Sequence, residues 1–324
     1  MRAVLCKAWG GPETLVVEDI AEPEPGPGEV LVAVRATGLN FFDTLIIQGK
    51  YQARPDFPFS PGSEMAGEVK ALGRHVTGLR VGDRVTAWLG WGGARESLVI
   101  KAEDAVPLPA SIAFETAAGL TVTYGTTLHA LRDRARLQSG ETLAVLGASG
   151  GVGQAAIEIG KVMGARVIAC ASSPDKLAFC RSLGADETVD YSRDDLKDAL
   201  RAATGGNGVD VVYDAVGGPY SEPALRAIAW NGRFLVIGFA AGDIPRIPLN
   251  LPLLKGCSIV GVFWGQHVER EPERHRTNMA TLLNWCAEGR IRPHVHRTYR
   301  LEETARALDA IAAREVKGKA ILVP

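Results

Sequence analysis

Residues 143–153, LAVLGASGGVG, place three glycines at a spacing that suits a phosphate-binding turn. Gly147, Gly150 and Gly153 form a GxxGxxG pattern, a relative of the dinucleotide-binding fingerprint. Such a turn needs glycine where the backbone bends sharply and approaches a pyrophosphate. It also needs free N–H groups at a helix start to receive the negative charge. We expect these N–H groups from three residues: Gly150, Gly151 and Val152.

The flanking sequence gives the glycine pattern its required setting of strand, turn and helix. LAVL before the glycines reads as a buried strand, and apolar residues from Val152 to Met163 recur at helical spacing. Gly164 then suits the position just after a helix end. The alternative is a glycine-rich tight turn that binds nothing.

The next strand indicates which dinucleotide binds. An NAD site usually has Asp or Glu roughly 20 residues beyond the first glycine, where it accepts hydrogen bonds from the ribose. Here RVIACASSPDK places Ala171 and Ser172 at the strand end, so no acid repels a 2′-phosphate. Ser172 and Ser173 can donate hydrogen bonds, and Lys176 lies in the first turn of a helix that Ser173 caps and Pro174 begins. NADPH is therefore favoured over NADH; a solvated surface lysine is the alternative reading of Lys176.

Length and composition bound the remaining possibilities. At 324 residues the chain predicts two domains. Its 36 basic and 37 acidic residues are interspersed, so neither nucleic acid nor an anionic membrane is the expected partner. No apolar stretch approaches the roughly 20 residues of a membrane helix, and the N-terminus has no signal-peptide pattern, so we expect a cytoplasmic protein. The five cysteines form no CxxC pair, which argues against a disulfide framework or a structural zinc site.

The character of the chain changes near residue 122. The first third is rich in Gly and Pro between short β-branched runs, which is typical of an irregular, mostly β domain. Strand-like runs then alternate with helical segments, which predicts a parallel sheet covered on both faces. We therefore expect a mostly β catalytic domain from residues 1–122 and 266–324, and a nucleotide-binding domain from residues 123–265.

These features, together with GLNFFDTLIIQGKY, PGSEMAGEV, GLRVGDRV and VGVFWG, make the chain resemble the medium-chain dehydrogenase/reductase superfamily, and within it the zinc-free quinone oxidoreductases. The resemblance covers essentially the whole chain. It implies an α/β fold in which a Rossmann doubly wound parallel sheet is inserted in a GroES-like, mostly β catalytic domain. Zinc-dependent relatives carry Cys in a GxCxxD motif and His in a GHE motif, where this chain has Asn40 and Ser63. Glu64 remains, but a catalytic zinc normally has three protein ligands, so no metal is expected.

The resemblance also implies roles for individual residues. Asn40 looks like an asparagine on the nicotinamide side, Tyr51 like a cleft tyrosine, and Thr123 like a hydroxyl near the nicotinamide ribose. Lys176 and Tyr191 match positions that hold the 2′-phosphate, which reinforces the choice of NADPH. Six further residues match turns that line the nicotinamide half: Val216, Gly238, Phe239, Phe263, Trp264 and Gly265. Without the resemblance, Phe263 and Trp264 could equally be core or interface aromatics.

The missing zinc ligands restrict the reaction. Without a Lewis acid to hold an alkoxide, the substrate must be easier to reduce than a simple carbonyl. A quinone or an activated enone fits, because its conjugated system spreads the charge that hydride delivers. We expect direct hydride transfer from NADPH C4 in the cleft between the domains, with Tyr51 and Asn40 steadying the oxyanion and solvent or Tyr51 providing the proton. Trp88 and Trp91 are candidates for a flat apolar wall.

Two other functions stay open. An NADPH-dependent 2-enoyl-thioester or enone reductase would need a longer acyl channel and a firmer proton donor. A non-catalytic NADPH-binding sensor would bind the cofactor without turnover. For the assembly, KGCSIVGVFWG reads as an edge strand that, by resemblance, pairs with its twin near Val260 in a homodimer.

Other polar features read as structural. His294 and His296 could face one side of a strand, but no third metal ligand is evident. Asp83, beside Gly82, reads as a turn residue rather than a general acid. His129 lies at helical spacing, where it is either a packing residue or a proton carrier.

Overall fold

The computed structural model describes residues 1–324, and the chain divides into two compact units. The first unit comprises Met1–Val122, Met279–Gly289 and Pro293–Pro324, and the second comprises Thr123–Asn278 and Arg290–Arg292. The chain therefore returns to the first unit at Met279, later than the residue 266 expected from the sequence. The reason is that the segment before Met279 is tied to the second unit: Asn278 accepts a hydrogen bond from Arg132.

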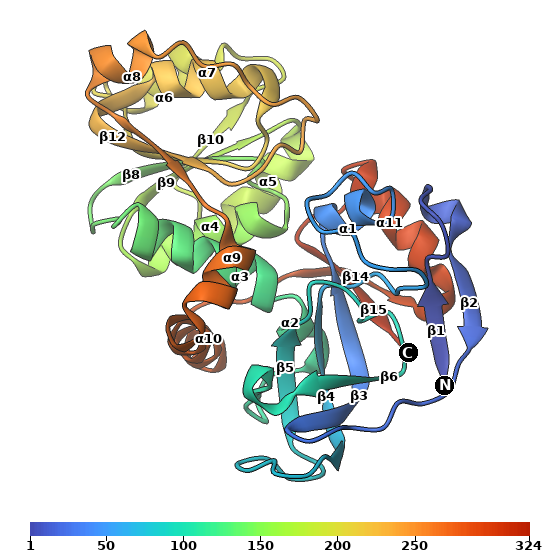
Figure 1. Ribbon diagram of the computed structural model, residues 1–324. Coiled ribbons are helices and arrows are strands. Elements are labelled where there is room, and N and C mark those ends of the chain that lie inside the picture. Colours follow the sequence, from blue (N-terminus) through green and yellow to red (C-terminus); the bar gives the residue numbers. More distant parts are fainter. The chain divides into compact units, whose positions relative to one another are not determined.

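The first unit is built on a seven-stranded sheet of order β14-β15-β3-β4-β5-β7, in which β6 also pairs with β3 (Figure 1). The sheet is antiparallel except for the parallel pair of β14 and β15. Its strands are β3 (Glu29–Leu39), β4 (Glu64–Leu72), β5 (Arg84–Trp88), β6 (Ser97–Lys101), β7 (Val106–Pro107), β14 (Val295–Arg300) and β15 (Lys319–Val323). A separate pair is formed by β1 (Arg2–Leu5) and β2 (Val16–Asp19), and the helices are α1 (Phe41–Ile46), α2 (Phe114–Ala118) and α11 (Thr304–Ala312).

Apolar residues alternate along the long strand β3, so that one of its faces packs in the core. Val30, Val32 and Val34 lie two residues apart, so their side chains emerge on one face, where they join a core with Val85 and Leu98 from neighbouring strands. Its last residue, Leu39, packs in a second core with Leu322 of β15. Asn40 follows directly, so β3 ends where the candidate active-site residues begin.

The second unit holds a six-stranded, fully parallel sheet of order β10-β9-β8-β11-β12-β13. In order of appearance this is 3-2-1-4-5-6, the doubly wound arrangement of dinucleotide-binding domains. The strands are β8 (Thr142–Leu146), β9 (Arg166–Ala171), β10 (Glu187–Asp190), β11 (Val209–Asp214), β12 (Ile228–Val236) and β13 (Ser258–Gly261). The helices are α3 (Thr121–Leu128), α4 (Gly151–Val162), α5 (Pro174–Ser182), α6 (Leu196–Ala203), α7 (Ser221–Arg226), α8 (Asn250–Lys255), α9 (Trp264–Arg270) and α10 (Pro272–Ala287), the last of which continues into the first unit.

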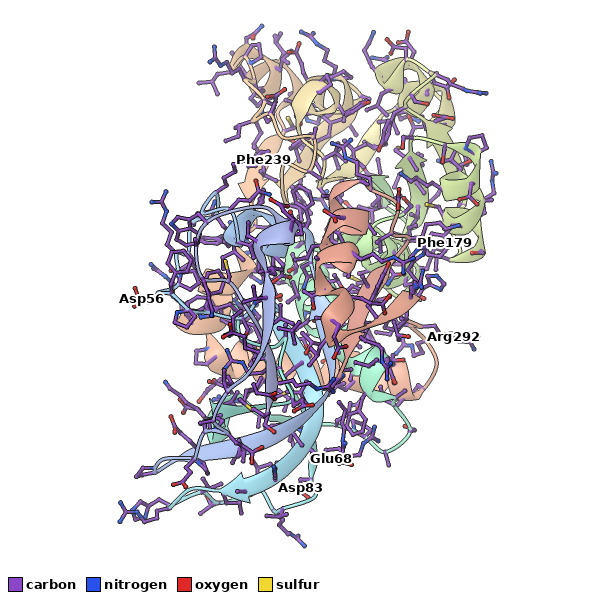
Figure 2. The ribbon with its side chains drawn as sticks, turned by 90° about the vertical axis from the view of Figure 1, so that its right-hand side faces the viewer. Asp56, Glu68, Asp83, Phe179, Phe239 and Arg292 are labelled. Atoms are coloured by element: carbon purple, nitrogen blue, oxygen red, sulfur yellow. The ribbon has the colours of Figure 1, made fainter.

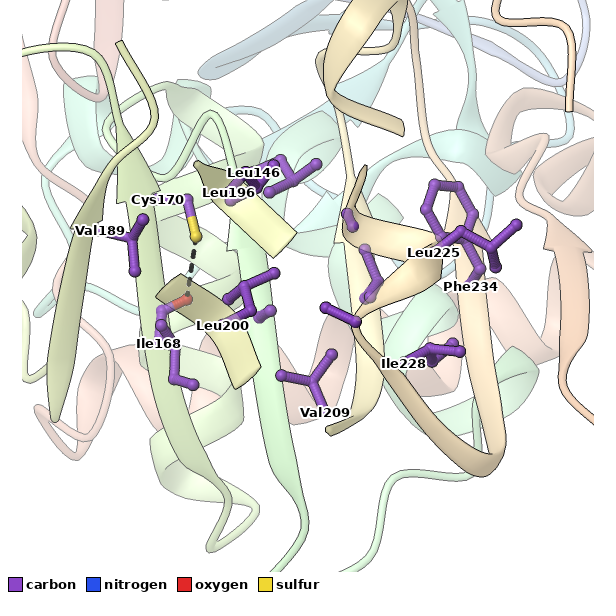
Figure 3. Close-up of a cluster of buried hydrophobic side chains, with 14 of the residues drawn as sticks. Leu146, Ile168, Cys170, Val189, Leu196, Leu200, Val209, Leu225, Ile228 and Phe234 are labelled. Atoms are coloured by element: carbon purple, nitrogen blue, oxygen red, sulfur yellow. Dashed lines mark hydrogen bonds between the residues drawn. The ribbon is translucent and has the colours of Figure 1, made fainter. Parts of the chain in front are cut away.

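Helices cover both faces of this parallel sheet, with α6, α7 and α8 on one face and α4 and α5 on the other (Figure 1). The core under α6 and α7 is apolar throughout: Figure 3 shows Leu200 and Leu225 from these helices packed on strand residues such as Ile168 and Phe234. Both sheet faces are thus buried, as the near-continuous apolar strands predict. The expected fold class, a Rossmann sheet inserted in a mostly β domain, is confirmed. None of the helices is both long enough and apolar enough to cross a bilayer.

Candidate cofactor and active site

The glycine turn lies between β8 and α4, as the sequence predicts. Gly147 follows the last residue of β8 with φ of +70°, a left-handed conformation that glycine adopts without strain. Gly153 packs so closely that a Cβ atom there would lie 2.3 Å from the carbonyl oxygen of Gly147. These two glycines are therefore required by the turn itself, whether or not a ligand binds.

Gly150 has a different explanation. It is the N-cap residue of α4 with φ of −79°, which any residue adopts, and a Cβ atom there would meet Gly147 O at 3.5 Å, an ordinary contact. Neither the backbone nor the packing requires glycine at this position, although glycine is a favourable helix N-cap residue. Its own N–H donates to Gly147 O at 3.1 Å, which leaves the N–H groups of Gly151 and Val152, in the first turn of α4, to receive an anion.

The candidate 2′-phosphate residues follow two neighbouring strands. Because β9 and β10 are parallel, with Ala171 opposite Asp190, Ser172 and Tyr191 leave the same edge of the sheet. Ser173 is the N-cap of α5, and its hydroxyl oxygen accepts the Lys176 N–H at 3.4 Å, so the predicted cap is confirmed. Lys176 is half-buried, and the residues directly after β9 are Ser172 and Ser173, with no acid.

The turn after β11 lies beside the glycine turn. A Cβ atom at Gly147 would lie 2.9 Å from the side chain of Val216, so these turns meet where the strand order reverses between β8 and β11. In open parallel sheets this is the place where nucleotides bind. Asp214 organises the second turn, since its carboxylate accepts the N–H of Val216 at 2.8 Å, that of Gly217 at 2.9 Å and the Ser221 hydroxyl at 2.5 Å.

Sequence reasoning did not select Asp214. Its signal was the DAVGG run, in which an acid precedes a glycine turn. Burial raises the pKa of this carboxyl, and its three hydrogen bonds oppose the rise. The Asp214 backbone carbonyl also accepts the Gly238 N–H at 3.3 Å, so this one residue links two turns that were expected to line the nicotinamide half.

The aromatic candidates divide by exposure. Phe263 is 56% exposed and Phe239 37% exposed, so both rings are free to meet a ligand or another chain. Trp264 is buried instead, against Gly125, where a Cβ atom would lie 2.8 Å from the indole ring. Of the two readings of this tryptophan, packing in the core is the one that the structure supports. Thr123, in α3, is buried as well.

The first unit holds the other group of candidates around a buried ammonium. Lys319, the first residue of β15, donates from Nζ to Asn40 Oδ1 at 2.6 Å, to Glu64 Oε1 at 2.8 Å and to the Leu39 carbonyl at 2.8 Å. The other oxygen of Glu64 accepts the Val122 N–H at 2.7 Å. The side chains of Lys319, Asn40 and Glu64 are all buried, so the cluster is a hydrogen-bonded ion pair shielded from solvent.

Asn40 uses its whole amide N–H₂ group inside this cluster. Nδ2 donates to Ser63 Oγ at 3.0 Å and to Glu64 Oε1 at 2.8 Å. A side-chain amide has only two N–H donors. Asn40 therefore has no free donor for a substrate oxyanion in this structure, and only its Oδ1 has acceptor capacity left.

Asp43 and Tyr51 complete this group. Asp43 accepts the Asn40 backbone N–H at 2.7 Å and the Gly62 N–H at 3.0 Å, and its burial raises the pKa of the carboxyl to about 7. Tyr51 is partly buried, and its ring stacks on Phe42 with 5.1 Å between centroids. Burial, helped by the charge of Asp43, raises the pKa of the Tyr51 phenol, so this phenol keeps its proton at neutral pH.

Other features of the sequence take structural places. Asp83 Oδ2 accepts the Arg80 N–H at 2.8 Å, so the predicted turn role is confirmed. Figure 2 shows Asp83, which directly precedes β5, close to Glu68 of β4. Trp91 is exposed in the loop after β5.

A histidine cluster in the second unit offers metal-ligating atoms but not metal geometry. His129, Asp133 and His267 bring one ligand atom each within 4.8 Å of one another. The two imidazole rings stack face to face, 3.8 Å apart and inclined by 13°, so their nitrogen lone pairs run side by side instead of converging. The Asp133 carboxylate is already within 3.4 Å of the guanidinium groups of Arg132 and Arg274. We read the cluster as a packed ion-pair network.

The doubly wound sheet with its glycine turn, and the mostly β unit with its buried polar cluster, together define a dinucleotide-binding oxidoreductase of the medium-chain type. Comparison with known proteins agrees with this class. Residues 26–110 match the family model described as alcohol dehydrogenase GroES-like domain, and residues 151–285 match the one described as zinc-binding dehydrogenase.

Three relatives are informative, of which two are named quinone oxidoreductase or quinone oxidoreductase-like and one is named enoyl reductase. The chain is 39% identical over 325 residues to quinone oxidoreductase-like protein 2 homolog of Nematostella vectensis, which covers 99% of this chain and 88% of that protein. The structure of Escherichia coli quinone oxidoreductase complexed with NADPH superposes with a TM-score of 0.93 at 28% identity, over 100% of both chains. A CurK enoyl reductase structure has a TM-score of 0.90 at 27% identity, over 99% of this chain and 98% of that one. The chain belongs to the quinone oxidoreductase family of medium-chain reductases and is an oxidoreductase.

One family description implies a zinc ion, and the residues at the resembling positions do not fit one. A catalytic zinc normally takes three protein ligands from Cys, His and carboxylate side chains. Here Asn40 and Ser63 offer an amide and a hydroxyl, and Glu64 is committed to Lys319 Nζ and Val122 N. The nearby carboxyl of Asp43 accepts the N–H groups of Asn40 and Gly62. Because the Lys319 ammonium already pairs with Glu64, the residues of this cluster do not fit a zinc ion.

Proposed function

We propose that this protein is a zinc-independent, NADPH-dependent oxidoreductase that reduces a quinone or a similarly activated carbonyl compound. The observation that carries the proposal is the buried Lys319–Glu64–Asn40 cluster, in which Glu64 is paired with an ammonium and Asn40 offers an amide in place of a thiolate or imidazole ligand. The three N–H donors of this ammonium are already bonded. It therefore cannot hold a developing alkoxide as a metal ion would. The acceptor must therefore delocalise the incoming charge within its own conjugated system.

The second unit fits NADPH. When bound, NADPH supplies the hydride. The N–H groups of Gly151 and Val152 would receive the pyrophosphate. Four residues at the ends of β9 and β10 would hold the 2′-phosphate: Ser172, Ser173, Lys176 and Tyr191. Six residues are proposed for the nicotinamide half: Thr123, Val216, Gly238, Phe239, Phe263 and Gly265. The NADPH complex of the Escherichia coli relative supports NADPH as the cofactor.

The first unit would orient and protonate the acceptor. Tyr51 holds its phenol proton at neutral pH, which suits a donor to the developing oxyanion. Asn40 keeps its place beside the nicotinamide in this proposal, but its two N–H donors are used internally, so Oδ1 is the atom available to a bound group. The oxyanion role falls to Tyr51, with solvent as the other source of the proton.

A second candidate is the reduction of an enone or a 2-enoyl thioester, which the similarity to the CurK enoyl reductase structure favours. The distinguishing experiment is NADPH oxidation by the purified protein with a small para-quinone, an α,β-unsaturated ketone and a 2-enoyl thioester as parallel acceptors. Preferential turnover of the quinone supports the first proposal. Turnover of the enone or thioester alone replaces it with the second, and tight NADPH binding without any turnover indicates a sensor.

We also propose a homodimer through β13. This strand is the edge of the parallel sheet, and the predicted edge position is confirmed. Its neighbourhood exposes large apolar side chains, among them Leu253 at 77%, Leu254 at 70% and Trp230 at 71%. Exposed apolar groups beside an unpaired edge suit strand addition by a second copy. Light scattering of Leu254→Glu should show monomers where the wild type shows dimers, and a dimeric variant or a monomeric wild type would contradict this assembly.

A cytoplasmic location completes the proposal. All five cysteines are free, and Cys6, Cys170 and Cys180 are buried. Such an uncrosslinked set suits a reducing compartment. Localisation of a tagged full-length chain tests it, and appearance of the protein outside the cytoplasm would contradict it.

A further inference from the structure

The buried ammonium of Lys319 has a complete set of partners. The residue is 2% exposed, and its three N–H donors meet three oxygens, from the Leu39 carbonyl, Asn40 and Glu64, at 2.6–2.8 Å. A lysine ammonium has three donors and no acceptor, so nothing in this group is left unsatisfied. The lysine is thus held at one point by fixed oxygen atoms.

Lys319 and Glu64 together allow only one orientation of the Asn40 amide. Because an ammonium only donates hydrogen bonds, the amide atom that faces it must be the oxygen. Because a carboxylate only accepts, the amide atom that faces Glu64 must be the nitrogen. A rotation of the amide by 180° would place N–H against N–H and oxygen against oxygen. The charged pair therefore determines which atom Asn40 presents.

We propose that Lys319 is a positioning residue for hydride transfer, because with Glu64 it locks the Asn40 amide in the orientation that presents Oδ1. This inference rests on the role proposed above for Asn40 beside the nicotinamide. Lys319 itself touches neither cofactor nor acceptor, and it acts through Asn40.

Stability alone does not account for such a pair. Replacing a buried ion pair by uncharged residues of similar volume is often neutral or even stabilising, whereas removing one partner is costly because the other charge stays buried. The surroundings also leave Glu64 little freedom: a Cβ atom at Gly38 would lie 2.7 Å from Glu64 Oε1. A rigid, oriented charge pair fits the task of fixing a neighbour.

The test compares two variants with a matched control. Lys319→Met keeps the volume of the side chain but leaves Glu64 unpaired, and it is expected to fold poorly. Lys319→Met combined with Glu64→Gln removes both charges, and glutamine both donates and accepts, so both orientations of the Asn40 amide become acceptable. The control is Lys161→Met, which breaks an ion pair with Asp186 in the second unit.

The first readout needs no activity. The side-chain amide protons of Asn40, assigned by their loss in Asn40→Asp, should exchange slowly with solvent in the wild type, because both are bonded and buried. In the double variant they should exchange at least about tenfold faster, or split into two sets of signals, while the control stays like the wild type. Unchanged Asn40 signals in the double variant would overturn the positioning claim, whatever the protein reduces.

The second readout is single-turnover NADPH oxidation by folded protein. The double variant should transfer hydride about 10- to 100-fold more slowly, because small misplacements of positioned groups cost rates of that order. Its NADPH dissociation constant should stay within about twofold, since the phosphate residues are untouched. If the exchange of the Asn40 amide protons changes and the rate of hydride transfer does not, the orientation of Asn40 does not matter for the reaction. That result would overturn the role proposed for Asn40. If the wild type turned over no acceptor, the proposed function would fail, and the exchange data would still decide whether Lys319 orients Asn40.

Discussion

Lys319 Nζ lies 2.6 Å from Asn40 Oδ1, although 279 positions separate the two residues in the chain. The contact arises because β15 pairs antiparallel with the end of β3, with Ala320 opposite Leu39. β15 thus brings Lys319 next to Asn40, which directly follows β3. The contact forms because the chain returns to its first unit after the parallel sheet.

Lys176 should decide the preference for NADPH. We expect Lys176→Ala to raise the NADPH dissociation constant about 10- to 100-fold, the usual worth of a charge-assisted hydrogen bond to an anion, and to leave NADH binding nearly unchanged. Fluorescence titration with both cofactors measures this, with Lys197→Ala on α6 as the control. Equal losses for NADPH and NADH would remove Lys176 from the phosphate site.

Tyr51 should affect the chemical step and not cofactor binding. Tyr51→Phe keeps the ring that stacks on Phe42 but removes the donor to the oxyanion. Single-turnover reduction should slow by about 100- to 1,000-fold at constant NADPH affinity, in the range found for single oxyanion donors. Tyr299→Phe, at a buried tyrosine of the same unit, is the matched control. A Tyr51→Phe rate equal to that of the wild type would exclude Tyr51 from the mechanism.

Alanine substitutions at Gly153 and Gly150 should separate an effect on stability from an effect on NADPH binding. Gly153→Ala should cost about 3 kcal/mol or more in unfolding free energy, because its Cβ would sit 2.3 Å from a backbone oxygen that has no rotamer to relieve the contact. Gly150→Ala should cost only about 1 kcal/mol, as for an alanine at a helix N-cap, but should raise the NADPH dissociation constant about tenfold or more. Urea unfolding and NADPH titration check both, and NADPH binding unaffected in Gly150→Ala would argue against pyrophosphate at this turn.

His275 should make the protein less stable in mild acid. Burial, and then the charges of His267 and Arg276, lower the pKa of His275 from 6.5 to about 4. At a pH between these two pKa values the unfolded chain binds more protons than the folded chain. The contribution of neutral His275 to the free energy of unfolding is therefore complete above about pH 6.5 and is lost as the pH falls toward 4. The loss has a limit of about 3 kcal/mol. His275→Phe keeps a ring against Trp264 and should flatten this dependence.

Urea unfolding at pH 7 and pH 5 measures the effect, with His75→Asn, at an exposed histidine of the first unit, as the control. A wild type and a His275→Phe variant that lose equal free energy between these two pH values would contradict the prediction.

Much of the second unit was predictable from the sequence because its signals are local. The strand before Gly147, the helical spacing after Gly150, the Ser173 cap and the C′ position of Gly164, with φ of +82°, all appear where the patterns place them. Each depends on residues within one or two turns of the chain. Periodicity and turn chemistry are therefore enough to locate them.

The buried polar cluster of the first unit could be predicted from the sequence only in part. Motif resemblance identified Asn40, but no local pattern marks Lys319 in VKGKAILV as its partner, since the contact depends on long-range strand pairing. The same limit applies to the hydrogen bonds of Asn40, which remove it as an oxyanion donor. It also applies to the domain return at Met279, which depends on contacts between Asn278 and the distant Arg132.

The most direct measurement of the central claim is a kinetic isotope effect on the chelator-treated protein. We predict that NADPH deuterated at both C4 positions is oxidised by a small para-quinone about two to five times more slowly than ordinary NADPH in a single turnover, with the same rates before and after removal of metals. That result would show metal-free hydride transfer. A rate that falls away with the chelator and returns with zinc, or turnover with no isotope effect at all, would contradict it.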